Sequence, residues 1–278
     1  MSTIDVWQAV VLGVVEGLTE FLPVSSTGHL KIAEGLMGIP VDDHSVVGFT
    51  AVIQVGAIAA VLVYFRKDIW RLASAWVRGV TGRGPRDARD YRFAWWIIYA
   101  TIPIVLVGLL AKPLIKGPLA SLWVVAASLV VGSGLMWAAE RYGRLQRGEE
   151  QATLTDTMLV GSSQILALLF PGFSRSGATI SVGLLRGLDR QAATRLSFFL
   201  SIPALTGAGV YELKDAAGGD TSIAALVVGT VVSFIVAYAS IAWLLRYVAR
   251  HTFTAFIVWR LVVAAVLAGL LASGTLAA

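Results

Sequence analysis

Long apolar runs alternate with short polar segments along the whole chain. A membrane-spanning helix needs about 20 mostly apolar residues, and six runs reach that length. They cover residues 44–65, 93–111, 119–140, 192–213, 223–246 and 252–272. The pattern therefore predicts an all-α, polytopic membrane protein with six spanning helices.

Two further apolar segments are interrupted by proline, serine and glycine. Residues 6–38 break at PVSSTGH (Pro23–His29), and residues 157–187 break at PGFSRSGAT (Pro171–Thr179). Each break separates two apolar arms that are too short to span a membrane. Non-helical backbone at membrane depth is tolerated only where protein or a wet cavity satisfies its polar groups. Both segments are therefore predicted to be re-entrant helical hairpins.

The two interrupted segments divide the chain into two repeats. SSTG (Ser25–Gly28) aligns with SRSG (Ser174–Gly177), and three predicted spans follow each break. Because three is odd, the second repeat must be inverted relative to the first. This predicts a single transmembrane domain, residues 1–278, with repeats at about 1–148 and 149–278. Broken helices in corresponding positions of inverted repeats indicate a site near the membrane midplane.

Composition agrees with a protein surrounded by lipid. Of the 278 residues, 57% are hydrophobic and 14% are charged, and the mean hydropathy is +0.77. The net charge of +5 does not indicate nucleic-acid binding, because the basic residues lie between apolar runs and not on an aromatic-interleaved patch. The absence of cysteine excludes disulfides and thiolate metal sites.

Lysine and arginine are concentrated in alternate loops, which orients the chain in its membrane. One side carries the basic residues Arg66, Lys67, Arg71, Arg78, Arg83, Arg86, Arg89, Arg92, Arg141, Arg144, Arg147, Arg186, Arg190, Arg195, Arg246 and Arg250. The other side carries only Lys31, Lys112, Lys116 and Lys214. We expect the first side, including a loop over 66–92, to be cytoplasmic. Both termini and the first hairpin then enter from outside, and the second hairpin enters from the cytoplasm.

Glu16 and Glu20 lie four residues apart inside an apolar segment, so both carboxylates share one helical face. An ionisable side chain inside the membrane is costly and indicates function. Two adjacent carboxylates repel each other unless a cation or a shared proton relieves them. The pair could ligate a hard divalent cation such as Mg²⁺ or Ca²⁺, or one member could be a general base.

Hydroxyl side chains and a histidine follow directly after the first proline. Ser25, Ser26, Thr27 and His29 lie within a few residues of the two carboxylates. Serine in a membrane helix usually bonds to backbone, and a lone histidine is usually structural. Their clustering favours chemistry instead. Ser26 is a candidate nucleophile, and His29 is a candidate base or leaving-group acid.

Arg175 lies at the break of the second hairpin. Its planar guanidinium suits phosphate oxygens. Ser174, Ser176 and Gly177 allow the backbone to curve around it, and a helix beginning near Ala178 would direct its free amides at an anion.

Two buried arginines also have structural interpretations. Arg175 could pair with Glu16 or Glu20 when the site is empty and bind phosphate when it is occupied. Arg260, inside the last apolar run, is more simply a structural partner for a carboxylate or for backbone carbonyls. Together, the candidate residues indicate a metal-assisted reaction on a phosphorylated substrate embedded in the membrane.

At these residues the sequence resembles the undecaprenyl pyrophosphate phosphatase family of the bacitracin-resistance type. EGLTEFLPVSSTGHL (Glu16–Leu30) and PGFSRSGATI (Pro171–Ile180) are similar to its two signature motifs, and IQVG (Ile53–Gly56) and the pair Ile202 and Pro203 fit its pattern. The resemblance implies hydrolysis of undecaprenyl pyrophosphate to undecaprenyl phosphate and phosphate at the outer face, with a divalent cation. It implies a role in recycling the lipid carrier of peptidoglycan synthesis.

The resemblance places functional roles on Glu16, Glu20, Ser26, His29 and Arg175. The phosphate-binding set predicted from the two motifs is Ser25, Thr27, Ser174, Arg175, Ser176 and Gly177. The sequence departs from the family pattern at two positions. Thr50 stands where the family often has glutamate, and Gln164 lies one residue further from Pro171 than expected.

Alternatives remain open for both mechanism and function. In the first mechanism, Ser26 attacks the terminal phosphorus with His29 as base, while the glutamates hold a cation. In the second mechanism, an activated water attacks, and Ser26 only positions the phosphate. The chief alternative function is a flippase for undecaprenyl phosphate, with or without hydrolysis, since inverted repeats also build transporters. A non-catalytic scaffold would not explain two buried carboxylates facing a buried arginine.

Overall fold

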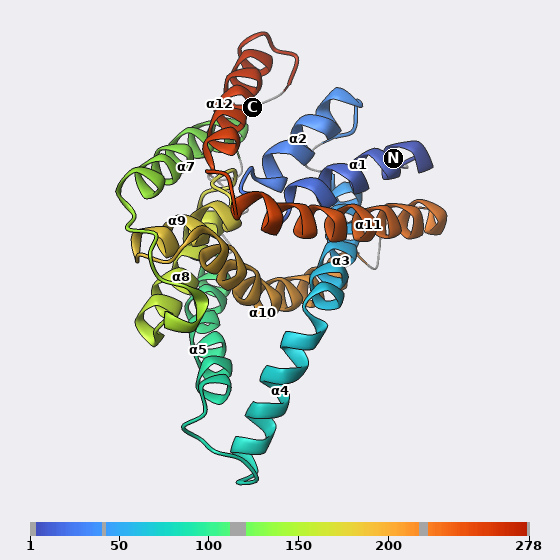
Figure 1. The fold of residues 1–278 in the computed structure, drawn as a ribbon. Helices are drawn as coiled ribbons and strands as arrows, with labels where there is room; N and C mark the ends of the chain where they lie inside the picture. The colour runs from blue at the N-terminus through green and yellow to red at the C-terminus, as the bar shows by residue number, and fades with distance from the viewer. Residues whose placement is uncertain (1–3, 41–42, 112–120, 217–221, 277–278) are drawn as a thin grey trace.

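The computed structural model describes residues 4–40, 43–111, 121–216 and 222–276 (Figure 1). Within these ranges the chain forms eleven α-helices and a single-turn 3₁₀ helix at Glu149–Gln151. The helices are α1 Val6–Thr19, α2 Ser26–Leu36, α3 His44–Tyr64, α4 Arg66–Val80, α5 Arg89–Leu110, α7 Leu122–Tyr142, α8 Leu154–Leu169, α9 Arg175–Leu185, α10 Arg190–Ala216, α11 Ile223–Val248 and α12 Thr254–Ala272. The predicted all-α class is confirmed.

Five of these helices are long and apolar enough to cross a membrane: α3, α5, α7, α11 and α12. They match five of the six predicted spans. The sixth predicted span forms helix α10, but α10 is not among the five that meet the criterion of length and hydropathy in the described residues. Its first turns carry Arg190 and Arg195, which belong to the polar end of the molecule.

The prediction of a loop over residues 66–92 is wrong for the first half of this segment. Residues 66–80 form α4, an amphipathic helix that extends away from the rest of the molecule with α5 beside it (Figure 1). Trp76 of α4 packs against Trp95 of α5 with ring centroids 5.6 Å apart, and the Tyr91 ring lies directly over Gly79. The high density of arginine in this segment obscured its helical spacing of apolar residues.

The two predicted breaks are present, and their backbones correspond. Ser25 and Ser174 each precede a short helix with a positive φ, 77° and 72°. Each caps its helix by accepting a hydrogen bond from the glycine three residues later, Gly28 and Gly177. The second helix begins at Arg175, earlier than the predicted start near Ala178. Positive φ at serine is strained, and such strain persists where the surroundings impose it, often at functional sites.

The two halves interlock by exchanging their first helices. Helix α1 packs on α11 of the second half, and α8 packs on α5 of the first half. Both contacts are close: a Cβ added to Gly17 would lie 2.7 Å from the Ser233 carbonyl oxygen, and one added to Gly161 would lie 2.5 Å from that of Ala100. Small residues of this kind let membrane helices approach closely. The exchange fixes the two breaks beside each other.

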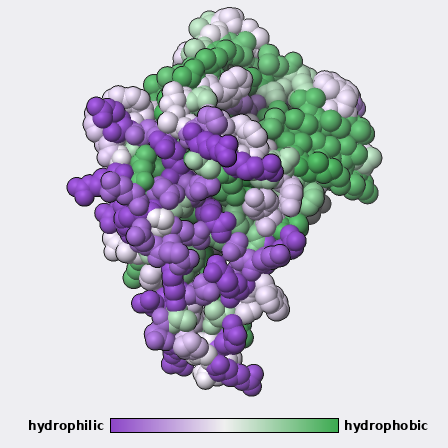
Figure 2. All heavy atoms as spheres, viewed as in Figure 1, coloured by the Kyte–Doolittle hydropathy of each residue, from purple (hydrophilic) through white to green (hydrophobic). Residues whose placement is uncertain are grey.

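The segments rich in arginine converge at one end of the molecule. Arg195 pairs with Glu149 and Asp68, and the fully buried Asp156 pairs with Arg147 and Arg186. The two termini lie toward the opposite end from α4 (Figure 1). Figure 2 shows hydrophilic residues gathered over α4 and the neighbouring polar segments, and hydrophobic residues over α11. The predicted basic side is therefore one region in space. Lys112 and Lys116, expected on the other side, lie outside the described residues.

Candidate active site

The two helix breaks bring three predicted side chains together. Ser26 Oγ donates a hydrogen bond to Glu20 Oε2 at 2.7 Å, and Arg175 Nη2 donates to Glu20 Oε1 at 3.1 Å. Glu20 and Arg175 are 155 positions apart in the chain. The carboxylate of Glu20 thus links a hydroxyl from the first break with a guanidinium from the second.

Glu20 owes its position to the end of α1. The helix ends at Thr19, Glu20 is its C-cap, and Pro23 lies in the turn that follows. Glu16 lies one turn earlier on the same face, and both carboxylates are at least nine-tenths buried. Beside them is a polar cleft of about 270 Å³ between α1, α2 and α3, which is lined by Glu16, Ser26, Thr27, Leu30, Lys31, Glu34, Val46, Val47, Thr50, Ala51 and Gln54. Of the three linked side chains, Ser26 lines this cleft.

Arg175 presents an unused donor to this region. Its Nη2 bonds to Glu20, whereas its buried Nη1 has no hydrogen-bond partner among the described residues. A buried donor without a partner costs about 1–3 kcal/mol, so such groups usually have a function. A guanidinium with one nitrogen already held by a carboxylate and the other available is suited to a phosphate oxygen.

The other predicted phosphate-binding hydroxyls mostly hold the backbone in this structure. Ser25 and Ser174 cap their helices, and Ser176 Oγ donates to the Leu22 carbonyl at 2.9 Å, which ties the second break to the first. Gly177 supplies the amide that bonds to Ser174. Thr27, by contrast, is exposed and lines the polar cleft.

His29 is held by partners other than Ser26. Its Nδ1 lies 2.7 Å from the Ser25 carbonyl oxygen, which can only accept, so Nδ1 carries the proton. Its Nε2 accepts a hydrogen bond from the indole nitrogen of Trp259 at 2.7 Å. The imidazole is therefore neutral and bonded at both nitrogens. The hydroxyl of Ser26 faces a carboxylate base, Glu20, rather than the predicted histidine.

Arg260 is the structural clamp of both breaks. It is fully buried and donates to five carbonyl oxygens and one hydroxyl. These acceptors are Pro23 O in the first break, Gly172 O and Phe173 O in the second, and Ser128 O, Leu129 O and Ser133 Oγ on α7. The interpretation of Arg260 as a partner of carbonyls is confirmed. Gly132 is required beside it, since an added Cβ would lie 2.3 Å from the Arg260 Nη2.

The donor set limits the kind of metal that could bind. Glu16 and Glu20 supply two carboxylates, and no cluster of three or more His, Asp or Glu side chains suited to a metal occurs within the described residues. Mg²⁺ is commonly held by one or two carboxylates together with substrate phosphates and water. These residues thus fit a hard cation that is also coordinated by the substrate. They do not fit a site in which the protein supplies all the ligands.

Comparison with known proteins assigns the chain to a family. The family described as Bacitracin resistance protein BacA matches residues 9–266. The chain belongs to this family. A Frankia alni protein named Undecaprenyl-diphosphatase 1 is 74% identical over 276 residues, which cover 99% of each chain. A Streptomyces avermitilis protein of the same name is 71% identical over 276 residues, covering 99% of this chain and all of the relative. The family resemblance of the two motifs is confirmed.

Two residues that depart from the BacA family pattern have different surroundings. Thr50, where the resemblance led us to expect a glutamate, lines the same polar cleft as Glu16 and Ser26. Gln164 is buried on α8, where its amide nitrogen donates to the Gly161 carbonyl at 3.3 Å, and it does not line the polar cleft. Sequence reasoning missed Trp259, because an aromatic residue in an apolar run resembles an interfacial anchor.

Proposed function

We propose that this protein hydrolyses undecaprenyl diphosphate to undecaprenyl phosphate and phosphate. The observation that carries the proposal is the link from Ser26 through Glu20 to Arg175, which places a nucleophile, a base and a phosphate ligand at one point. The relatives named as undecaprenyl-diphosphatases favour this reaction over transport alone. The activity would return the lipid carrier to peptidoglycan synthesis and confer resistance to bacitracin.

In the proposed reaction, Ser26 Oγ attacks the terminal phosphorus and its proton passes to Glu20 Oε2. The bond between that phosphorus and the bridging oxygen breaks, and undecaprenyl phosphate leaves. Water then attacks the phosphoserine, which releases phosphate and restores the hydroxyl. The hydrogen bond of 2.7 Å between Ser26 and Glu20 supports Glu20 as the base in place of His29. In the alternative route, Glu20 activates water and Ser26 only positions the phosphate.

Arg175 binds the phosphate that is transferred. Because Nη1 has no partner among the described residues, a phosphate oxygen can add to it while Nη2 exchanges Glu20 for a second oxygen. Glu20 thereby loses its ion pair with Arg175 as it accepts the proton from Ser26. A divalent cation held by Glu16 and Glu20, when bound, would neutralise the charge that develops on the diphosphate.

We propose that the polar cleft opens to the outside in a fold of six spans and two re-entrant hairpins in inverted repeats. Phe21, next to Glu20, packs edge-on against Phe198 of α10 at 5.5 Å, and Phe65 packs on Phe198 at 6.0 Å. Arg195 of the basic end covers the Phe65 ring at 5.3 Å. This aromatic layer separates the site from the basic end, which we assign to the cytoplasm.

Orientation can be tested because the natural chain has no cysteine. Single cysteines at Asp43 and Arg83 are labelled in intact cells with a membrane-impermeant thiol reagent. We expect labelling at position 43 and protection at position 83 until the cells are permeabilised. Preferential labelling at position 83 would reverse the proposed topology.

The activity is tested by phosphate release from undecaprenyl diphosphate with purified protein in detergent. We expect multiple turnovers with Mg²⁺ present and strong inhibition by a chelator. Glu20→Gln should be inactive because it loses the proton acceptor, while Glu149→Gln at the basic end is the matched control and should retain activity. A wild-type protein that binds the lipid but releases no phosphate in detergent would reject hydrolysis and favour the flippase alternative.

A further inference from the structure

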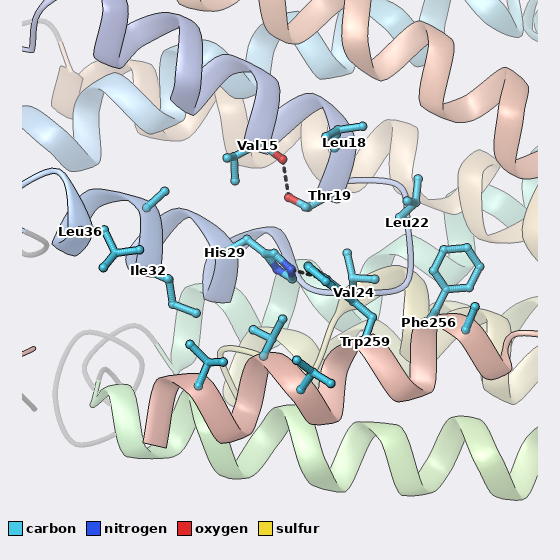
Figure 3. Close-up of a pocket in the computed structure, with 15 residues that line it drawn as sticks. Val15, Leu18, Thr19, Leu22, Val24, His29, Ile32, Leu36, Phe256 and Trp259 are labelled. Carbon is cyan, nitrogen blue, oxygen red and sulfur yellow. Dashed lines mark hydrogen bonds between the residues drawn. The ribbon is translucent and has the colours of Figure 1, made fainter. Parts of the chain in front are cut away.

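An apolar groove of about 620 Å³ lies between the first hairpin and α12 (Figure 3). It is lined by Val15, Leu18, Thr19, Leu22, Val24, His29, Ile32, Ala33, Leu36, Ala255, Phe256, Trp259, Val262, Val263 and Val266. Thr19, His29 and Trp259 are the lining residues with side-chain hydrogen bonds. The Thr19 hydroxyl donates to the Val15 carbonyl at 2.6 Å, and the ring nitrogens of His29 are both bonded. The lining therefore presents a mainly apolar surface to a ligand in the groove.

The groove and the polar cleft lie on two sides of α1 and α2, next to the first break. On α2, Ser26, Thr27 and Lys31 line the polar cleft, whereas His29, Ile32 and Leu36 line the groove. Helix α1 is divided in the same way, with Glu16 toward the cleft and Leu18 toward the groove. Ser26 and His29, three residues apart on α2, mark the border between the two. A molecule with a charged head at Ser26 and a long apolar tail would meet both surfaces.

We infer that the groove binds the part of the substrate's polyprenyl chain nearest the diphosphate. The inference rests on the proposed function, which supplies a substrate with that chemistry. The volume lies within the range of about 300–1,000 Å³ typical of ligand pockets, so it suits the proximal isoprenoid units and not a whole long chain. The indole of Trp259 forms one wall of the groove and donates a hydrogen bond to His29 (Figure 3). A polyprenyl chain in the groove would therefore contact a residue that is bonded to His29, at the border of the site.

The first test fills the groove and leaves the catalytic centre unchanged. Val262, which is 48% exposed, lines the groove, and Val258, which is 55% exposed and one turn away on α12, does not. We expect Val262→Trp to raise the KM for undecaprenyl diphosphate at least tenfold and to change kcat/KM for methyl diphosphate, which has no isoprenoid unit, less than twofold. Val258→Trp should change neither value. Val266→Trp, a second substitution in the groove wall, should behave like Val262→Trp.

The outcomes separate this inference from the proposed function. Unchanged KM values for both groove variants, or equal effects of Val258→Trp and Val262→Trp, would mean that the groove holds only bulk lipid. An equal loss on both substrates would likewise overturn the inference, because a chain-binding site must discriminate by chain length. In each of these cases the wild type still releases phosphate, whereas a wild type that releases none rejects the proposed function itself.

A second test does not depend on turnover. A farnesyl diphosphate analogue with a diazirine on its first isoprenoid unit is photo-crosslinked to the wild-type protein, and the adducts are mapped by mass spectrometry. We expect adducts within residues 15–24, 29–36 and 255–266, which line the groove, and competition by unlabelled undecaprenyl diphosphate. Adducts confined to other helices would show that the chain leaves the site by another path and would overturn the inference.

Discussion

Replacement of Arg260 by lysine tests whether one side chain holds both helix breaks in place. Lysine keeps the positive charge but has three N–H donors on one atom, in place of a planar fork with five. Arg260 makes six hydrogen bonds to acceptors on three separate segments. The three N–H groups of lysine lie on one atom and cannot reach all three segments, so we expect at least three of the six hydrogen bonds to be lost.

The magnitude follows from that loss. Hydrogen bonds to charged groups contribute about 1.5–3 kcal/mol each, which gives about 4–5 kcal/mol for three bonds at the lower value. Averages within membrane proteins are nearer to about 0.6 kcal/mol per bond, which sets a lower bound of about 2 kcal/mol. We therefore expect Arg260→Lys to lower the free energy of unfolding by about 2–5 kcal/mol. Activity should fall further, because Pro23 and Phe173 lie in the loops that carry the reactive groups.

The purified protein is unfolded by denaturant in detergent, and unfolding is monitored by tryptophan fluorescence. Phosphate release by the same variants is measured separately. Arg246→Lys is the matched control, because Arg246 is exposed on α11 and has no described partner in a hydrogen bond or ion pair. Its unfolding free energy should stay within about 0.5 kcal/mol of the wild type. If Arg260→Lys unfolds and turns over like that control, the clamp interpretation is refuted.

Three further substitutions separate the roles within the site. Ser26→Ala should reduce phosphate release to background, and a quenched wild-type reaction should contain phosphate attached to Ser26; measurable turnover by the variant would favour the water route. Arg175→Lys should lower kcat as well as raise KM, because it loses the fork that binds the transferred phosphate; normal kinetics would remove Arg175 from the phosphate site. Trp259→Phe should release His29 Nε2, which ¹⁵N NMR of the three histidines would detect as a change from the Nδ1–H tautomer, while Trp243→Phe should leave that signal unchanged.

Sequence alone determined the features that depend on local composition. Apolar run length identified the helices now seen as α3, α5, α7, α11 and α12, and the proline and serine clusters identified both breaks. The internal match of SSTG with SRSG predicted equivalent breaks, and the positive φ of Ser25 and Ser174 confirms that equivalence. These features were accessible because hydrophobicity, proline and glycine act on the backbone within a few residues.

Only the tertiary structure decided which side chains are partners. Glu20 meets Arg175 across 155 positions, and His29 meets Trp259 across 230. The spacing of Ser26 and His29 favoured a histidine base, yet the turn after Pro23 brings Ser26 to Glu20 instead. Helical spacing places residues on a face, but the donor and acceptor that face it come from other helices. Such pairs are set by packing, which a single sequence does not encode locally.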